Sequence, residues 1–163
     1  MLLPGFPLSV PCKSFIFVQI LIIVQFNNIP DFLDQDQVET ALVGFVHEHT
    51  YRIEKLVYNF VSKEELHKMN QEFLNHDTHT DIITFDYTIK KALRAEFFIS
   101  MWAVVRSAKS HSQSTENEVL RVISHGVLHC MGQNDKNREG KEQMRKSENR
   151  FIKMFHVKQK SHV

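Results

Sequence analysis

The sequence predicts an α+β fold, in which one compact domain packs helices against a mixed sheet of about four strands. Its 163 residues are 42% hydrophobic and 24% charged, which is the composition of a single globular domain. Segments with alternating or β-branched patterns interleave with segments of helical period. Their order is strand, helix, strand, helix, strand, strand and then helices, and a mixed sheet accommodates this order.

The expected domain covers residues 19–157. Residues 1–18 contain three prolines and are expected to form a poorly ordered N-terminal extension, while residues 158–163 are expected to form a basic tail. The apolar run at 14–26 is too short to span a bilayer, which takes about 20 apolar residues, so no membrane association is expected. Its β-branched residues predict the first strand, at Ile20–Phe26.

The first half of the domain is predicted to contain a helix, a strand and a second helix, at Asp36–Arg52, Lys55–Val61 and 63–74. Asp34 or Asp36 is the candidate cap of the first helix. The strand follows from the alternation of apolar and polar residues. Ser62 and Glu65 have the spacing of a capping box, in which each side chain bonds the backbone N–H of the other, and this box opens the second helix.

The second half is predicted to contain two strands and three helices, at Ile82–Tyr87, Ala95–Ser100, Met101–Ser110, 115–131 and 139–155. A basic linker at Thr88–Arg94 is expected between the strands. Thr115 and Glu118 have the spacing of another capping box and would begin the fourth helix. The wide apolar stripe of that helix indicates that it is buried. Gly132 fits the left-handed position that ends a helix.

The fourth helix carries the strongest chemical signal of the chain. His125 and His129 are four residues apart, so both imidazoles lie on one helical face. Asp135 follows the expected helix end and can turn back toward them. Two nitrogens and a carboxylate oxygen form a ligand set for one divalent metal, as in zincin-like helices, and leave a coordination position open for water. The sequence therefore predicts a catalytic metal site with metal-bound water as the nucleophile and no identified catalytic side chain.

Gly126 narrows the chemistry of this site. Metalloproteases with the His-Glu-x-x-His motif have their general base where this chain has Gly126, which weighs against peptide hydrolysis. A glycine inside a helix costs about 1 kcal/mol relative to alanine, so this one indicates a close backbone approach or a ligand that needs room. Cys130 points about 100° away from His129 around the helix axis, and we expect it to be packed rather than a ligand.

Charge is unevenly distributed along the chain. The formal net charge is only +1, which gives no global nucleic-acid signature. Residues 136–163, however, contain nine Lys or Arg and three Glu, a net charge of +6. A solvated helix face followed by a basic tail is the simpler interpretation of this charge taken alone. Binding of a polyanion near the metal is the alternative.

Three blocks of the sequence resemble one known family. They are His125-Gly126-Val127-Leu128-His129-x-x-Gly132-x-x-Asp135, the segment from Leu74 to Tyr87 that contains Thr80-Asp81-Ile82-Ile83-Thr84-Phe85, and Met144-Arg145-x-x-Glu148-Asn149. Together they are similar to the YbeY family of metal-dependent endoribonucleases, in the branch that has aspartate as the third metal ligand. The resemblance spans about Ile20 to Phe155.

This resemblance implies a zinc ion held by His125, His129 and Asp135 in a compact α+β domain. It also implies hydrolysis of single-stranded RNA, with ribosomal RNA as the substrate and the 3′ end of the small-subunit RNA as the place of action. The expected setting is the cytoplasm, in contact with the small ribosomal subunit. Other first-row metals suit the same ligand set, so the identity of the metal stays open.

The main departure from the family pattern concerns phosphate binding. Many members have an arginine in the first loop, and the aligned residue here is Leu74. Other side chains would then contact the phosphate, and the candidates are His76, Lys90, Lys91, Arg94 and Lys136. His76 and His79 are also candidates for lining the cleft.

Two other functions fit the same residues. The chain could be a non-catalytic ribosome assembly factor whose metal is structural, or a metallohydrolase that acts on another class of substrate. A buried helix with two histidines satisfied inside the core is the simplest alternative to any metal site. Stoichiometric metal in the purified protein, together with cleavage of RNA, would separate these hypotheses.

Overall fold

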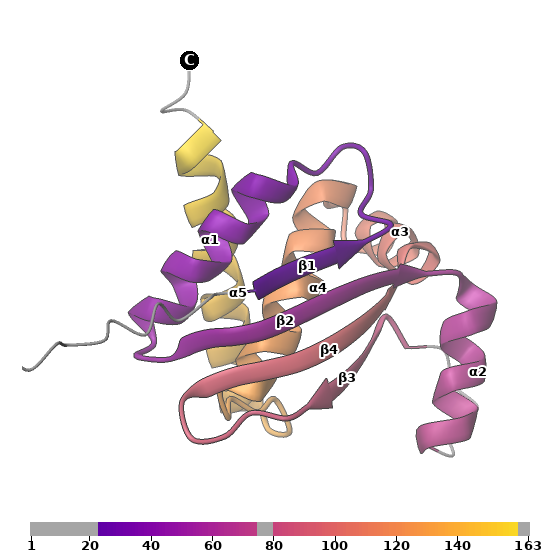
Figure 1. The fold of residues 1–163 in the computed structure, drawn as a ribbon. Coiled ribbons are helices and arrows are strands. Elements are labelled where there is room, and N and C mark those ends of the chain that lie inside the picture. Colours follow the sequence, from indigo (N-terminus) through magenta and orange to yellow (C-terminus); the bar gives the residue numbers. More distant parts are fainter. Residues whose placement is uncertain (1–22, 75–79, 160–163) are drawn as a thin grey trace, which may run out of the picture.

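The computed structural model describes residues 23–74 and 80–159, which form a mixed four-stranded sheet and five helices (Figure 1). The elements in chain order are β1 (Ile23–Asn27), α1 (Gln35–Glu48), β2 (Arg52–Val61), α2 (Lys63–Leu74), β3 (Ile82–Asp86), β4 (Ala92–Ser100), α3 (Met101–Ser110), α4 (Thr115–Cys130) and α5 (Arg138–Gln159). The predicted fold class is confirmed. The expected N-terminal extension at 1–18 lies outside the described residues.

The strand order in the sheet is β1-β2-β4-β3. β1 and β4 both run parallel to β2, whereas β3 runs antiparallel to β4 and forms an edge. Parallel neighbours need a crossover connection, and α1 supplies it between β1 and β2. α2 lies between β2 and the β3–β4 hairpin in the chain. The long strands β2 and β4 are therefore central in the sheet, and the helices pack against them.

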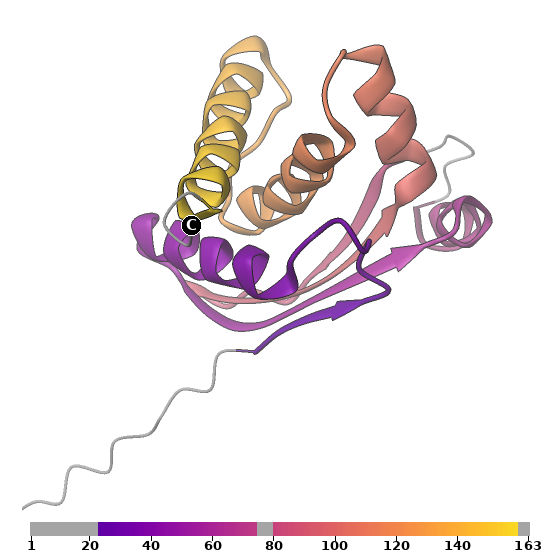
Figure 2. The ribbon, with the colours of Figure 1, turned by 90° about the horizontal axis from the view of Figure 1, so that it is seen from above.

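Helices α1, α3, α4 and α5 lie on one face of this sheet (Figure 2), and α2 packs against β3 and β4. The largest fully buried side chains come from both layers and are Tyr58, Phe45, Phe97, Phe151, Phe155, Leu42, Leu56, Leu66, Leu93, Ile99, Leu120 and Ile123. Ten of the sixteen residues of α4 are buried, so the predicted burial of this helix is confirmed. Among the described helices, none combines the length and the apolar character that crossing a membrane requires.

The first helix is shorter than predicted. It ends at Glu48 rather than at Arg52, because Thr50 adopts a left-handed conformation with φ of 63°. The backbone N–H of Arg52 then donates to the carbonyl of Lys91 at 2.9 Å, and pairing with β4 recruits Arg52 into β2. Asp34, one of the two candidate caps, accepts a hydrogen bond from the backbone N–H of Gln37 at 3.0 Å.

The strand β4 is longer than predicted, for the same reason. It begins at Ala92 rather than at Ala95, since Ala92, Leu93 and Arg94 pair with β2. The expected linker at Thr88–Arg94 is therefore reduced to a tight turn in which Lys90 has a φ of 56°. At the other end of the domain, α5 extends through Gln159.

Candidate metal centre

Helix α4 and the turn after it bring the candidate ligands together. His125 and His129 lie one turn apart on α4, and their rings are 4.4 Å apart between centroids. The helix ends in a Schellman motif at Gly132, whose φ of 85° is left-handed as predicted. The backbone N–H of Gln133 donates to the Leu128 carbonyl at 3.0 Å, and that of Gly132 to the His129 carbonyl at 2.9 Å. This reversal turns the chain back toward the histidines.

The three ligand atoms form a compact cluster. The Nε2 atoms of His125 and His129 are 2.9 Å apart, and Oδ1 of Asp135 lies 3.9 Å from Nε2 of His129. All three ligand atoms lie within 4.8 Å of one another. Two ligands of a tetrahedral zinc ion are separated by about 3.3 Å when each is 2.0–2.1 Å from the metal. The distances bracket this value, so the three side chains fit one small divalent ion.

The second nitrogen of each imidazole supports the same interpretation. Nδ1 of His129 donates to the backbone carbonyl of Gln133 at 2.9 Å, and Nδ1 of His125 donates to Oε1 of Glu148 at 2.9 Å. A carbonyl oxygen can only accept, so the proton of neutral His129 lies on Nδ1 and the Nε2 lone pair faces the cluster. Metal-binding histidines have this second-shell pattern. Both Nε2 atoms therefore face the cluster, where they lie 2.9 Å from each other.

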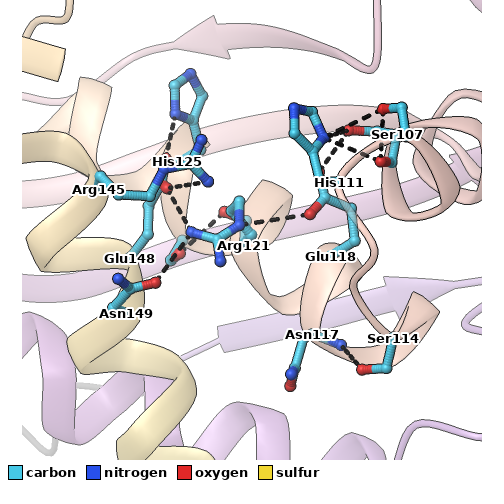
Figure 3. A network of polar contacts seen from close by, with 12 residues as sticks. Ser107, His111, Ser114, Asn117, Glu118, Arg121, His125, Arg145, Glu148 and Asn149 are labelled. Atoms are coloured by element: carbon cyan, nitrogen blue, oxygen red, sulfur yellow. Dashed lines mark hydrogen bonds and ion pairs between the residues drawn. The ribbon is translucent and has the colours of Figure 1, made fainter. Parts of the chain in front are cut away.

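Glu148 belongs to a buried polar network beside the site (Figure 3). Its carboxylate accepts from His125 through one oxygen and from Nη1 of Arg121, at 2.9 Å, through the other. Arg121 also lies 3.4 Å from Glu118 through its Nε atom, and Glu118 accepts from the Ser107 hydroxyl at 2.7 Å. Both glutamates are only 5% exposed. Because Arg121 lies between them, the two buried carboxylates share one cation.

These contacts determine the protonation of His125 and Glu148. Burial lowers the pKa of His125, but the hydrogen bond that His125 donates to Glu148 and the charges of Glu148, Asp81 and Asp135 outweigh burial and raise it above its usual value. Burial raises the pKa of Glu148, but the hydrogen bonds from His125 and Arg121 outweigh it and lower the pKa. Glu148 is therefore ionised at neutral pH and can orient the imidazole of His125.

The prediction of a second capping box, formed by Thr115 and Glu118, is wrong. Ser114, not Thr115, caps α4, since its hydroxyl accepts from the backbone N–H of Asn117 at 3.1 Å. Glu118 does not turn back to the helix end, because Arg121 and Ser107 hold its carboxylate in the interior. The first box is confirmed. The carboxylate of Glu65 accepts from the backbone N–H of Ser62 at 2.9 Å, and the Ser62 hydroxyl accepts from that of Glu65 at 3.2 Å.

Gly126 marks a close backbone approach, which is the first of the two alternatives predicted for it. A Cβ atom at this position would lie 2.8 Å from the ring of Phe97 and 2.9 Å from Cδ1 of Ile82. The Phe97 ring has no room to yield, because it stacks on Tyr58 at 4.6 Å, and Tyr58 stacks on Phe26 at 5.2 Å. The absent side chain lets α4 lie against the sheet between its two histidines.

The loop that carries Asp135 is held by contacts of its own. The Tyr51 hydroxyl donates to the Met131 carbonyl at 2.9 Å where the loop begins. Where it ends, the side chain of Asn137 accepts from the backbone N–H of Gly140 at 2.7 Å. A Cβ atom at Gly140 would lie 2.5 Å from the Asn134 carbonyl oxygen. This second glycine therefore lets the loop lie against the first turn of α5.

Other residues singled out in the sequence lie elsewhere or play packing roles. Cys130 is buried, and burial together with Asp86 raises the pKa of its thiol to about 12, which fits a packed residue. Arg94 pairs with Lys55 and points away from the buried face that Leu93 forms. Lys91 donates to the Thr50 hydroxyl. His76 and His79 lie outside the described residues, and Leu74 is the last described residue of α2.

Sequence reasoning assigned no role to Glu148 or Arg121. Glu148 appeared only as part of the third block that resembles the family, and its place opposite His125 depends on how α5 packs on α4. Arg121 lies four residues before His125, on the same face of α4. That spacing was the one signal in the sequence that could have identified it.

Comparisons with known proteins match most of the chain to one family. The family model described as endoribonuclease YbeY matches residues 25–156. A protein of Flavobacterium johnsoniae with that name is 41% identical over 138 residues, which cover 83% of this chain and 99% of the relative. Another, from Bacteroides thetaiotaomicron, is 38% identical over 103 residues, which cover 63% of this chain and 75% of the relative.

A solved structure resembles the fold. The solution structure of a Thermotoga maritima protein superposes with a TM-score of 0.64 at 20% sequence identity, covering 86% of this chain and 93% of the other. At this identity the likeness concerns the fold alone.

Proposed function

The chain belongs to the endoribonuclease YbeY family, and we propose on this premise that it is a metal-dependent endoribonuclease that hydrolyses single-stranded RNA. The observation that carries the proposal is the cluster of His125, His129 and Asp135, whose ligand atoms lie within 4.8 Å of one another. Both imidazoles are oriented through Nδ1, so both Nε2 atoms face the cluster. This cluster is the candidate site for one zinc ion.

A divalent ion bound there would supply a Lewis acid for the phosphodiester and lower the pKa of water. The residues of the chain prepare the site for this chemistry. Glu148 and the Gln133 carbonyl fix the two imidazoles in one tautomer and orientation. Arg121 keeps Glu148 ionised, and the loop places Asp135 opposite His129. Two nitrogens and one carboxylate leave a coordination position for water or for a phosphoryl oxygen.

The choice of RNA over a peptide rests on two features of the chain. Position 126 is a glycine whose neighbours leave no room for the glutamate of a metallopeptidase. The helix α5 next to the cluster is rich in Lys and Arg, which suits a polyanion. We extend the proposal to ribosomal RNA, with processing at the 3′ end of the small-subunit RNA, contact with the small ribosomal subunit and a cytoplasmic location.

The test joins elemental analysis to an RNA cleavage assay on the full chain. The wild type is expected to contain about one equivalent of metal and to cut a single-stranded RNA. The variant Asp135→Ala is expected to lose the metal and to cut at least about 100-fold more slowly. Asp31→Ala, at an exposed aspartate remote from the cluster in the sequence, is the matched control. Metal-loaded wild type that leaves RNA intact would refute the proposal.

A cellular assay separates catalysis from a purely structural role. The variant His129→Ala is expected to fail both in RNA cleavage and in supporting ribosome maturation. If it supports maturation while its nuclease activity is absent, the chain acts as a non-catalytic assembly factor instead.

A further inference from the structure

Helix α5 places two cations beside the metal ligands. His125 and Asp135 line a pocket of about 260 Å³ together with Lys141, Met144, Arg145 and Glu148. Lys141 and Arg145 are four residues apart, so they lie on one face of α5. Met144 is buried beneath them, whereas both basic side chains are exposed. The pocket therefore has ligand atoms on the α4 side and positive charge on the α5 side.

The charge of Arg145 is not needed to stabilise the buried network. Its Nη1 lies 3.7 Å from Oε2 of Glu148, which is beyond hydrogen-bond distance. Arg121 already donates to that oxygen at 2.9 Å, and His125 donates to the other one. Figure 3 shows Arg145 beside Glu148 on the side of His125. The planar fork of this guanidinium can therefore turn to a ligand, and it matches a phosphate in geometry.

A wider hollow of about 590 Å³ continues from these two residues along α5. Its lining shares Lys141 and Arg145 with the smaller pocket and adds Lys136, Asn137, Arg138, Glu142 and Lys146. Its one acid, Glu142, pairs with Arg138 at 3.3 Å. Within the described part of the chain, no ion pair joins Lys136, Lys141 or Lys146 to an acid. The hollow is therefore positively charged, and at Lys141 and Arg145 it meets the smaller pocket that His125 and Asp135 line.

We propose that Lys141 and Arg145 bind the phosphodiester backbone of the RNA strand beside the metal ligands, and that the hollow along α5 carries the strand away from them. This inference rests on the proposed function. It assigns the phosphate contacts to α5, since the chain has Leu74 where many family members have an arginine in the first loop. Of the five candidates named from the sequence, Lys136 lines the same hollow. Arg94 lies on the opposite face of the sheet.

The test measures binding rather than cleavage. A fluorescently labelled single-stranded RNA is titrated with the full chain in a chelator, so that no cleavage occurs, at several salt concentrations. The double variant Lys141→Met/Arg145→Met is expected to bind at least about tenfold more weakly. The slope of log K against log salt should become shallower by about 0.7 for each lost phosphate contact. A DNA strand of the same sequence should show the same loss, because its phosphates are the same.

Arg150→Met is the matched control. Arg150 lies on the same helix and is 54% exposed, against 55% for Arg145, but it pairs with Glu48 of α1 at 2.9 Å. Its loss should leave the salt slope unchanged. An unchanged slope in the double variant, an equal loss in Arg150→Met, or a loss confined to RNA would each overturn the inference. Cleavage by metal-loaded wild type, measured separately, tests the proposed function itself.

Discussion

The two histidines of the candidate centre are held by two walls of different construction. The carboxylate wall consists of Glu148, Arg121 and Glu118, and it supports His125 from α5 and from the interior of α4. The loop wall consists of residues 131–137, and it supports His129 through a backbone carbonyl and carries Asp135. The first wall is buried, charged and assembled from distant parts of the chain. The second is half exposed, and its support for His129 is neutral and local.

Because of this difference, substitutions in the two walls should differ in their effect on the free energy of unfolding. A buried charge that loses its partner is costly, so the carboxylate wall couples His125 to the folding of the domain. The backbone groups of an exposed loop can bond to water when a contact is lost, so the loop wall can change with little effect on folding. We therefore expect substitutions in the two walls to have similar effects on the metal and different effects on the free energy of unfolding.

The largest effects should come from the histidines themselves. Both His125→Ala and His129→Ala are expected to lose stoichiometric metal. In the metal-free protein, His125→Ala should lower the free energy of unfolding by about 1–3 kcal/mol, because Glu148 loses a buried partner. His129→Ala should lower it by less than about 1 kcal/mol, because water can reach the Gln133 carbonyl. Urea denaturation of chelator-treated proteins measures this, and equal losses would contradict the comparison.

Glu148→Gln should weaken metal binding about 10–100-fold while the loop is unchanged. The substitution keeps the size of the side chain but removes the charge that orients His125 and pairs with Arg121. Competition with a chromophoric chelator measures the affinity. Glu142→Gln, at an exposed acid on the same helix, serves as the control. A metal affinity equal to that of the wild type would show that the carboxylate wall is not functional.

Gly140→Ala tests the loop wall in the same way. Alanine favours a helix over glycine by about 1 kcal/mol, but its Cβ would lie 2.5 Å from the Asn134 carbonyl oxygen and displace the loop. The expected result is a metal affinity about tenfold lower, with a free energy of unfolding that stays within about 1 kcal/mol of the wild type. A large loss of stability at unchanged metal affinity would reverse the assignment of the two walls.

Glu65 is an exposed carboxylate that serves as a comparison for the buried Glu148, and its substitution should have the smallest effect. Hydrogen bonds from the backbone and side chain of Ser62 lower the pKa of Glu65. Its stabilising effect is therefore present above the unfolded-state pKa and is lost as the pH falls through the folded-state value. The difference in unfolding free energy between the wild type and Glu65→Ala should shrink when the pH is lowered below the ordinary pKa of glutamate, about 4.3. A difference independent of pH would mean that the capping box does not depend on the charge of Glu65.

The parts of the site that depend on local sequence were predictable. Two histidines at helical spacing, a glycine that ends the helix and an aspartate after it are all readable from one short segment, and their spatial clustering follows. The carboxylate wall was not predictable, because Glu148 reaches His125 only after α5 packs on α4. The wrong capping box has the same origin. Ser114 and Thr115 are both suitable caps, and Arg121 draws Glu118 into the interior.

The fold shows the same division between local and distant causes. The predicted bounds of α2 and α3 are confirmed, and the capping box of Ser62 and Glu65 identified the start of α2 from local sequence. The first helix was predicted too long and β4 too short because pairing between Arg52 and Ala92 extended both central strands. Strand pairing joins residues that are distant in sequence, so periodicity alone cannot place such ends.

The glycine between the two histidines has a consequence for how this domain can evolve. A side chain at position 126 requires a smaller residue at position 97, and a smaller residue there removes the ring on which Tyr58 stacks. Tyr58 stacks in turn on Phe26 of the next strand, so the three rings form one packed row across the sheet. Substitution at Gly126 is therefore viable only together with changes on several strands of the sheet. A single mutational step away from glycine should be rare among functional descendants of this chain.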